Sequence, residues 1–192
     1  MPNDPNLTAF SMLMQGQDED TIRHCLRLRE ACGTLAGELG IEGPALRELE
    51  YGALLHDIGM FRIPPIIRTK PGPLTDEEWK QIRRHPDLGA ELIGEITTLE
   101  SSAAIVRCHH EWWDGSGYPR GLAGEAIPLG ARILTVIDAF DAMSVKSAHR
   151  PRRTPSEALE EIRRCAGTQF DPRVVEAFER QFDEFVRLSE GA

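Results

Sequence analysis

LLHDIGM, at residues 54–60, ends a stretch from 46 to 58 in which apolar side chains recur at helical spacing. Gly59 is expected to end this helix, so His56 and Asp57 fall in its last turn. The apolar residues on both sides of this pair predict that the turn packs against neighbouring helices. An imidazole next to a carboxylate in such a place indicates a metal site built into the core of a helical bundle.

Helical patterns also lie on both sides of this stretch. On the N-terminal side we expect a helix with His24 near its start and Gly40 at its end, whose apolar face is formed by Leu26, Cys32, Leu35, Ala36 and Leu39. On the C-terminal side, Thr75 and Glu78 match a capping box. This box opens a helix that runs toward His85, so the same helix is expected to carry that histidine.

The rest of the chain continues the helical pattern. Helices are expected over 101–110 and 132–143, and a further helix begins with Asp171 as N-cap and Pro172 at its first position. The last helical pattern carries a stripe that indicates core packing rather than a cofactor site: Val174, Val175, Phe178, Phe182, Phe185 and Val186. Residues 111–128 are rich in glycine and predict an ordered loop or a short hairpin. The predicted fold class is all-α.

Composition limits the classes of function. A chain of 192 residues with 41% hydrophobic content can bury one large core, which predicts a single domain. Its net charge of −9 argues against DNA or RNA as a partner. No apolar stretch is long enough to span a membrane, so the cytoplasm is the expected compartment. No CxxC pair occurs, which indicates reduced thiols at Cys25, Cys32, Cys108 and Cys165.

Potential metal ligands form an ordered series along the chain. Five of the six histidines alternate with acids in the order His24, His56, Asp57, His85, His109, His110 and Asp138. A single histidine is usually an ordinary polar residue, but this series of nitrogen and oxygen donors predicts a multinuclear site. An aspartate that bridges two ions suits phosphoester hydrolysis.

Two pairs of acids or histidines leave alternatives open. His109 and His110 would point about 100° apart in a regular helix, so either they serve different metals or the helix unwinds there. Asp138 and Asp141 lie in a strongly apolar helix, where buried carboxylates need partners. We expect Asp138 to be a ligand and Asp141 to be a structural carboxylate that pairs locally.

Five segments together resemble the HD-GYP family, the branch of the HD phosphohydrolase superfamily associated with bacterial cyclic di-GMP breakdown. The segments are DEDTIRHCLR at 18–27, LLHDIGM at 54–60, RRHPDLGAELI at 83–93, HHEWWDGSGYP at 109–119 and VIDAFDAM at 136–143. The resemblance covers about 18 to 185. It implies an HD-domain bundle over 18–187, preceded by a segment at 1–17 that leads into the first helix and followed by a tail at 188–192.

The resemblance also implies which residues bind metal. The expected ligands are the seven residues of the series above, with Asp20, one helical turn before His24, as an eighth that would help to hold a third ion. Two or three divalent ions are therefore expected. Because the donors are nitrogen and oxygen without thiolate, iron or manganese is the first choice, and zinc or nickel can bind by mis-metallation.

The activity implied is metal-dependent hydrolysis of cyclic di-GMP to pGpG, with GMP as a further product, by a metal-activated hydroxide. Asp57 and His56 are the expected catalytic positions. Gly117, Tyr118 and Pro119 are expected beside the substrate. In the family this loop is also implicated in contacts with diguanylate cyclase domains, which makes such a domain a possible partner.

Two departures from the family concern the substrate side. Met60 replaces the lysine usual in the HDIGK motif, and a thioether offers neither charge nor proton. After the helix with Asp138, an alignment without a gap puts Ser147 in the place of an arginine and Arg150 in that of the second basic residue. A shifted alignment matches Arg150 and Pro151 to the Arg-Pro of the family and leaves Arg152 in the place of its tyrosine. In both alignments Arg150 is the best phosphate contact. Two alternatives follow: a low-activity module that binds a cyclic dinucleotide or a cyclase, and a phosphodiesterase for another cyclic dinucleotide such as cyclic GMP-AMP.

Overall fold

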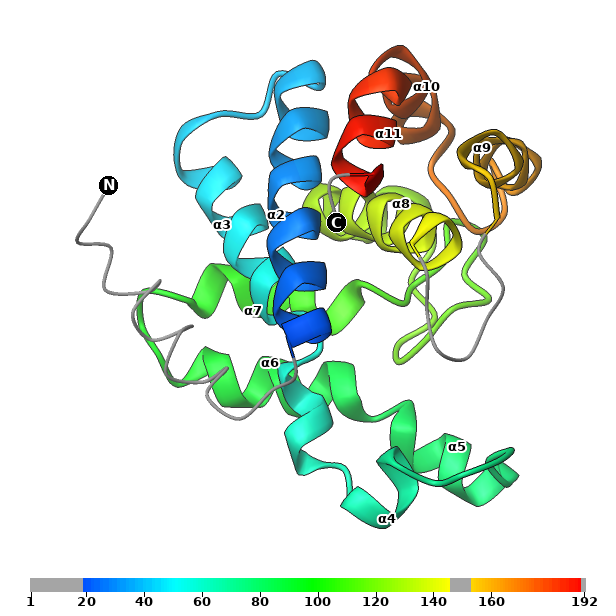
Figure 1. Ribbon diagram of the computed structural model, residues 1–192. Helices are drawn as coiled ribbons and strands as arrows, with labels where there is room; N and C mark the ends of the chain where they lie inside the picture. The colour runs from blue at the N-terminus through cyan, green and yellow to red at the C-terminus, as the bar shows by residue number, and fades with distance from the viewer. Residues whose placement is uncertain (1–18, 146–152, 191–192) are drawn as a thin grey trace.

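The computed structural model describes residues 19–145 and 153–190, and within these ranges the chain forms helices and no strand (Figure 1). This confirms the all-α class. The elements are α2 (Glu19–Glu38), α3 (Gly43–Leu55), η1 (Ile58–Arg62), α4 (Pro65–Arg68), α5 (Asp76–Ile82), α6 (His85–Gly94), α7 (Glu100–Cys108), η2 (Gly124–Ala126), α8 (Leu129–Ser144), α9 (Pro155–Arg164), α10 (Pro172–Arg180) and α11 (Phe182–Glu190). The segment between α7 and α8 is a loop with the short turn η2, not a hairpin.

The larger part of the core surrounds α8. This helix packs against α2, α3, α7, α9 and α10, and its large apolar side chains that are at most 2% exposed are Ile133, Leu134, Val136 and Ile137. Aromatic rings close the core on the side of α10 and α11, where the rings of Phe178 and Phe185 stack with centroids 4.6 Å apart. The C-terminal aromatic stripe is therefore core packing, as predicted.

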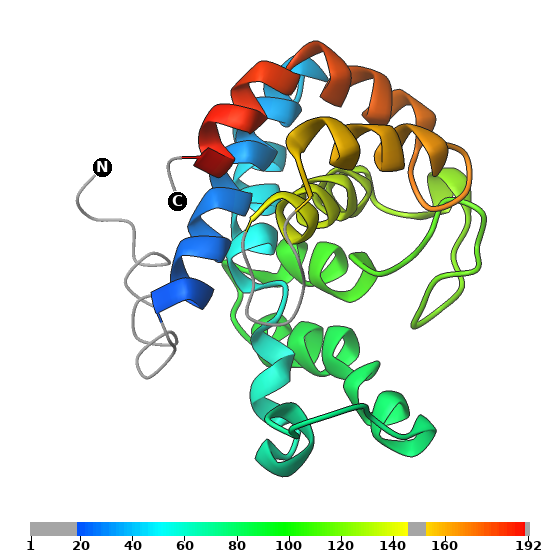
Figure 2. The same cartoon turned by 45° about the vertical axis from the view of Figure 1, so that its right-hand side comes forward.

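A smaller apolar cluster joins α3, η1, α6 and α7, and includes Leu54, Ile58, Ile93 and Val106. Beyond it, α4 and α5 project from the end of the bundle opposite α9, α10 and α11, as both views show (Figures 1 and 2). The expected metal ligands come from elements that meet between the larger core and this projection.

The helix around LLHDIGM differs from its prediction at both ends. It begins at Gly43 instead of 46, because Pro44 suits the first helical turn. It ends at Leu55, so His56 caps it and Asp57 lies in the following turn rather than in the helix. The cause is close packing: a Cβ on Gly59 would lie 2.0 Å from the carbonyl oxygen of His85, so the backbone of η1 lies directly against α6.

Two other predicted helices are each divided in two. The capping box of Thr75 and Glu78 is present and opens α5, but α5 ends at Ile82, and His85 begins the next helix. Pro86 is the reason, since proline suits the first turn of a new helix and not the interior of an old one. The C-terminal pattern is divided between α10 and α11, and α11 runs to Glu190 through the expected tail.

The cysteines are free, and all but Cys165 are buried, as their spacing predicted. Burial raises the pKa of the Cys25 thiol to about 12 and that of Cys108 to about 11, so both stay protonated at neutral pH. Among the described helices, none has the length and apolar content that a membrane span requires.

Candidate metal centre

The seven ligand candidates of the series form two neighbouring groups. Site A consists of His24, His56 and Asp138, and site B consists of Asp57, His85, His109 and His110. Within each group, one ligand atom per residue lies within 4.8 Å of the others. Site A draws on α2, the end of α3 and the middle of α8. Site B draws on the turn after α3, the start of α6 and the residues that follow α7.

Asp57 lies between the two sites. Its Oδ2 is 3.4 Å from Nε2 of His56 in site A, whereas its Oδ1 is 3.1 Å from Nε2 of His85 and 3.9 Å from Nε2 of His109 in site B. Half of the Asp57 side chain remains exposed, so the carboxylate is open to solvent from one side. With one oxygen facing each group, this carboxylate has the geometry of a bridging ligand.

Three histidines are oriented by the helix that precedes each of them. Nδ1 of His56, His85 and His109 donates to the carbonyl oxygen of the third residue before it, at 2.9, 2.8 and 2.6 Å. These carbonyls lie in the last turn of α3, α5 and α7, where the helix supplies no amide partner. Because a carbonyl only accepts, Nδ1 carries the proton of the neutral imidazole, and Nε2 then keeps its lone pair for a metal.

The Nε2 atoms of His85 and His109 lie 3.2 Å apart. Two lone pairs that converge in this way repel each other unless a cation lies between them. The donor set therefore fits divalent metal ions: imidazole nitrogens and carboxylate oxygens, with the imidazoles already in the tautomer that a metal needs.

His24 is held by a side chain instead of a carbonyl. Its Nδ1 donates to Oδ2 of Asp141 at 2.7 Å, and Oδ1 of Asp141 accepts from Nε of Arg27 at 2.8 Å. Nε2 of His24 then lies 3.5 Å from Asp138. Burial raises the pKa of Asp141, but its bonds to His24 and Arg27 lower it more, so it lies below its usual range. Asp141 thus has structural partners, but they lie on α2, far away in the sequence, and not locally as predicted.

The histidines of the centre differ in their affinity for protons. Burial, together with neighbouring histidines, lowers the pKa of His109 well below its usual range and that of His110 to about 4. For His56, burial acts in the same direction, but the carboxylates of Asp57 and Asp138 outweigh it and raise the pKa to about 9. His109 and His110 are thus neutral at pH 7 without metal, whereas an ion must displace a proton from His56.

His109 and His110 lie together because the helix ends before them. α7 stops at Cys108, His109 caps it, and both histidines contribute to site B. Their ring centroids are 4.1 Å apart. Of the two alternatives left by the sequence, the structure therefore favours unwinding of the helix over ligation of different metals.

The loop after α7 lies beside site B. The ring of Tyr118 stacks on His110 with centroids 4.8 Å apart, and its backbone N–H donates to the carbonyl of His110. At Gly117 a Cβ would lie 2.3 Å from the backbone nitrogen of Trp112, so only glycine fits the tight return of the chain. Gly117 thus allows the turn that places Tyr118 against His110, and Pro119 follows Tyr118 in the same loop.

Two functional side chains were missed by the sequence reading. Glu111 is 2% exposed and accepts from the backbone N–H of Arg120 at 2.7 Å and of Leu122 at 3.1 Å, which anchors the loop. An acid within an aromatic stretch directly after two histidines was the available signal. Arg83 places its guanidinium 5.5 Å from the ring centroid of Tyr118. Nothing in the sequence distinguishes Arg83 from Arg84 beside it.

One predicted site residue, Asp20, is not brought to the centre, and the structure does not describe another, Arg150. Asp20 lies in the first turn of α2, belongs to neither site, is 94% exposed and has Arg23 as its ion-pair partner at 3.7 Å. Arg150, with Ser147, lies outside the described residues. Met60 lies in η1 and is partly buried.

Comparisons with known proteins agree with this geometry. The family model described as "HD domain" matches residues 8–174. A cyclic di-GMP phosphodiesterase from Thermotoga maritima is 38% identical over 174 residues, which are 90% of this chain and 47% of that protein. A 3'3'-cGAMP-specific phosphodiesterase from Vibrio cholerae is 32% identical over 177 residues, which are 91% of this chain and 34% of that protein. The chain thus spans about half or less of the length of these curated relatives.

Solved structures share the fold. An HDG"Y"P protein from Bdellovibrio bacteriovorus aligns with a TM-score of 0.68 at 22% identity, over 93% of this chain and 58% of its own. The HD domain of the Listeria monocytogenes phosphodiesterase PgpH, in complex with cyclic-di-AMP, aligns with a TM-score of 0.63 at 16% identity, over 95% and 96%. Together with the match of the family model and the curated relatives, these findings confirm the resemblance: the chain belongs to the HD domain family, in its HD-GYP branch.

Proposed function

We propose that this chain is a metal-dependent phosphodiesterase that opens cyclic di-GMP to pGpG and cleaves pGpG further to GMP. The observation that carries this proposal is the position of Asp57, with one carboxylate oxygen toward each group of ligands. A pair of ions bridged in this way suits the hydrolysis of a phosphodiester. The identity of 38% to a cyclic di-GMP phosphodiesterase supports the choice of substrate.

The residues of site A, together with Asp57, would hold one ion, and the residues of site B would hold a second. The donors are nitrogen and oxygen without thiolate, which favours iron or manganese and also admits zinc or nickel. A third ion through Asp20 would require this side chain to leave Arg23 and turn toward His24.

When bound, divalent ions supply a nucleophile from water at neutral pH and offset the charge that develops on the phosphate. The residues of the chain set the positions of the two metal sites and of their ligand atoms. Asp57 fixes the separation of the two sites, and the carbonyl bonds of His56, His85 and His109 hold each Nε2 toward the centre. Tyr118 limits the open side next to His110.

The experiment is to purify the protein without oxygen, measure its metal content, and follow cyclic di-GMP by chromatography with added iron or manganese. Asp57→Ala removes the shared ligand and should lower kcat/KM by more than about 100-fold. Asp183→Ala, an exposed acid of α11, is the matched control and should behave as wild type. Wild-type protein that is fully loaded with metal and hydrolyses no cyclic di-GMP would contradict the proposal.

Two alternatives have specific support. Relatives named 3'3'-cGAMP-specific phosphodiesterases, at 30–32% identity, favour testing cyclic GMP-AMP in the same assay. Met60 favours a low-activity module that binds its nucleotide but turns it over slowly, because no positive charge stands at this position of η1. Met60→Lys should then raise kcat, and an unchanged kcat would show that the methionine is tolerated.

We also propose the loop at 111–123 as the contact for a diguanylate cyclase domain. Glu111 anchors this loop from inside, while the Arg120 side chain is 56% exposed and pairs with Asp87. Mixing the protein with a purified cyclase domain and measuring association by light scattering tests the contact. Arg120→Ala should weaken association if the loop forms the interface, and an unchanged affinity would exclude this surface.

A further inference from the structure

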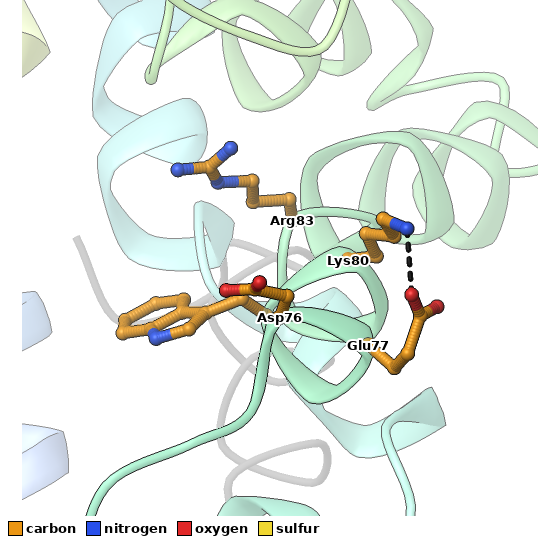
Figure 3. Close-up of a pocket in the computed structure, with 5 residues that line it drawn as sticks. Asp76, Glu77, Lys80 and Arg83 are labelled. Atoms are coloured by element: carbon orange, nitrogen blue, oxygen red, sulfur yellow. Dashed lines mark hydrogen bonds and ion pairs between the residues drawn. The ribbon is translucent and has the colours of Figure 1, made fainter.

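A pocket of about 430 Å³ lies on the projecting part of the molecule (Figure 3). Its described lining residues come from α5 and from the residue that caps it: Asp76, Glu77, Trp79, Lys80 and Arg83. We call this hollow the α5 pocket. Trp79 is 48% exposed, a large aromatic surface in contact with water.

Arg83 connects the α5 pocket to the metal centre. Its guanidinium lines the pocket and also lies over the ring of Tyr118, at 5.5 Å from the centroid. The Tyr118 ring in turn stacks on His110, a ligand of site B. A molecule that reaches from site B past Tyr118 therefore meets Arg83 and then the pocket.

Two of the charged side chains of the α5 pocket pair with each other, and two have no polar partner among the described residues. Lys80 and Glu77 pair with each other at 2.7 Å, and Figure 3 draws this pair on one side of the helix. Asp76 and Arg83 extend on the other side. Within the part of the chain that the structure describes, neither of these two side chains has an ion pair or a hydrogen bond. One carboxylate, one guanidinium and one indole thus face the pocket without polar partners.

This combination matches guanine better than other parts of a nucleotide. The O6 and N7 acceptors of guanine suit a guanidinium, its N1–H and amino group suit a carboxylate, and its ring can stack on an indole. A phosphate would use Arg83 but would be repelled by Asp76. Adenine would place the acceptor N1 opposite the carboxylate and the donor N6 where O6 meets the guanidinium, so it would keep only the contact of N7 with Arg83.

We infer that the α5 pocket binds one guanine of a cyclic dinucleotide whose phosphodiester lies at the metal centre, an inference that rests on the proposed function. Arg83 contacts the O6 and N7 edge, Asp76 the N1 and N2 edge, and Trp79 one face of the base. Cyclic di-GMP and cyclic GMP-AMP can each place a guanine there, and cyclic di-AMP cannot. The pocket is thus a determinant of base specificity.

The test compares Asp76→Asn and Arg83→Ala with two controls of matched chemistry. Asp183→Asn removes an acid from the first turn of α11, as Asp76→Asn does from α5, and Arg84→Ala removes the neighbouring exposed cation. Metal-loaded proteins are assayed on cyclic di-GMP, on cyclic di-AMP and on bis(p-nitrophenyl) phosphate, a diester without a base. Calorimetry gives the affinity of each protein for cyclic di-GMP.

In both pocket variants, kcat/KM and the affinity for cyclic di-GMP should each fall by about tenfold. The fall in kcat/KM should come from a higher KM and not from a lower kcat. Activity on bis(p-nitrophenyl) phosphate should stay within about twofold, as should all activities of the two controls. Asp76→Asn should also reduce the preference for cyclic di-GMP over cyclic di-AMP by about tenfold. Equal losses on both kinds of diester, or no loss on cyclic di-GMP, would overturn the inference.

The two hypotheses fail in different ways. If wild type hydrolyses cyclic di-GMP and both pocket variants hydrolyse it equally well, the proposed function is supported and the guanine site is contradicted. Suppose that wild type fully loaded with metal binds cyclic di-GMP without hydrolysing it, and that the pocket variants bind it more weakly. This result would support the guanine site and contradict the proposed function. Wild-type protein that neither binds nor hydrolyses cyclic di-GMP would overturn both.

Discussion

Substitution of Asp141 by asparagine should weaken one metal site and spare the other. Asp141 accepts Nδ1–H of His24 at 2.7 Å and both Nε–H and Nη2–H of Arg27 at 2.8 and 3.0 Å. Among the described hydrogen bonds to Nδ1 of the histidines in sites A and B, this one alone uses a side chain, whereas His56, His85 and His109 use backbone carbonyls. The neutral amide keeps the shape of the carboxylate but loses its charge.

The size of the effect of Asp141→Asn follows from the loss of the carboxylate behind His24 and from the loss of the charged partner of Arg27. A carboxylate behind a ligating imidazole raises the basicity of the ligand, and removal of such a partner costs about 10- to 100-fold in metal affinity. The Arg27 side chain is 15% exposed, so the loss of its charged partner should also lower the free energy of unfolding by about 2 kcal/mol. His24 belongs to site A alone, so the affinity of site B should change less than about threefold.

Equilibrium dialysis against manganese, with metal content measured by mass spectrometry, resolves the two affinities. Arg27→Met is the control, because it removes the second partner of Asp141 and leaves the bond to His24 in place. It should lower stability to a similar extent without a selective loss at one site. Equal losses at both sites in Asp141→Asn, or unchanged affinity together with unchanged stability, would refute the reasoning.

Three further predictions concern stability. Gly59→Ala should lower the free energy of unfolding, measured by urea titration, by about 3 kcal/mol, because its Cβ would lie 2.0 Å from a backbone oxygen of α6. The control Gly37→Ala, whose Cβ has nothing within 4 Å, should be neutral or stabilising in the same titration. In metal-free protein, the pKa of about 4 for half-buried His110 should lower the free energy of unfolding by about 2 kcal/mol as pH falls from 6.5 to 5, and the raised pKa of His56 should lower it as pH rises from 6.5 to 9. A pH series of urea midpoints that stays flat would contradict both. Glu111→Gln leaves one loop amide without an acceptor and should lower the free energy of unfolding by about 2 kcal/mol and raise KM for cyclic di-GMP; unchanged values of both would show that the loop holds without it.

The sequence predicts the helical class and the order of the ligands well because both depend on local signals. Apolar spacing, the capping box at Thr75 and the N-cap at Asp171 act within a few residues, and the structure contains each of them. The series of histidines and aspartates is equally visible. The structure brings all seven into two neighbouring sites, and their binding of metal stays a prediction.

The grouping of the ligands depends on contacts that the sequence does not show. α3 ends early because Gly59 packs against the backbone at His85, which lies far along the chain. The sequence therefore predicts His56 and Asp57 on a helical turn, although a bend after α3 places them on different sites. The same limit applies to Arg83 and Glu111, whose roles depend on the course of the loop around Tyr118.

The carbonyl bonds of the imidazoles have a consequence for how this centre tolerates change. Side-chain partners of a metal ligand are lost by single substitutions, but the acceptors of His56, His85 and His109 are peptide oxygens that every amino acid supplies. The residues that surround these histidines can therefore diverge widely as long as the helix ends stay in place. Of the four histidines whose Nδ1 bond is described, His24 alone depends on the identity of another side chain, so sequence drift at Asp141 would weaken site A and leave these three carbonyl bonds intact. For protein design, a histidine just past a helix terminus, bonded to the carbonyl three residues earlier, offers a ligand whose orientation needs no supporting residue.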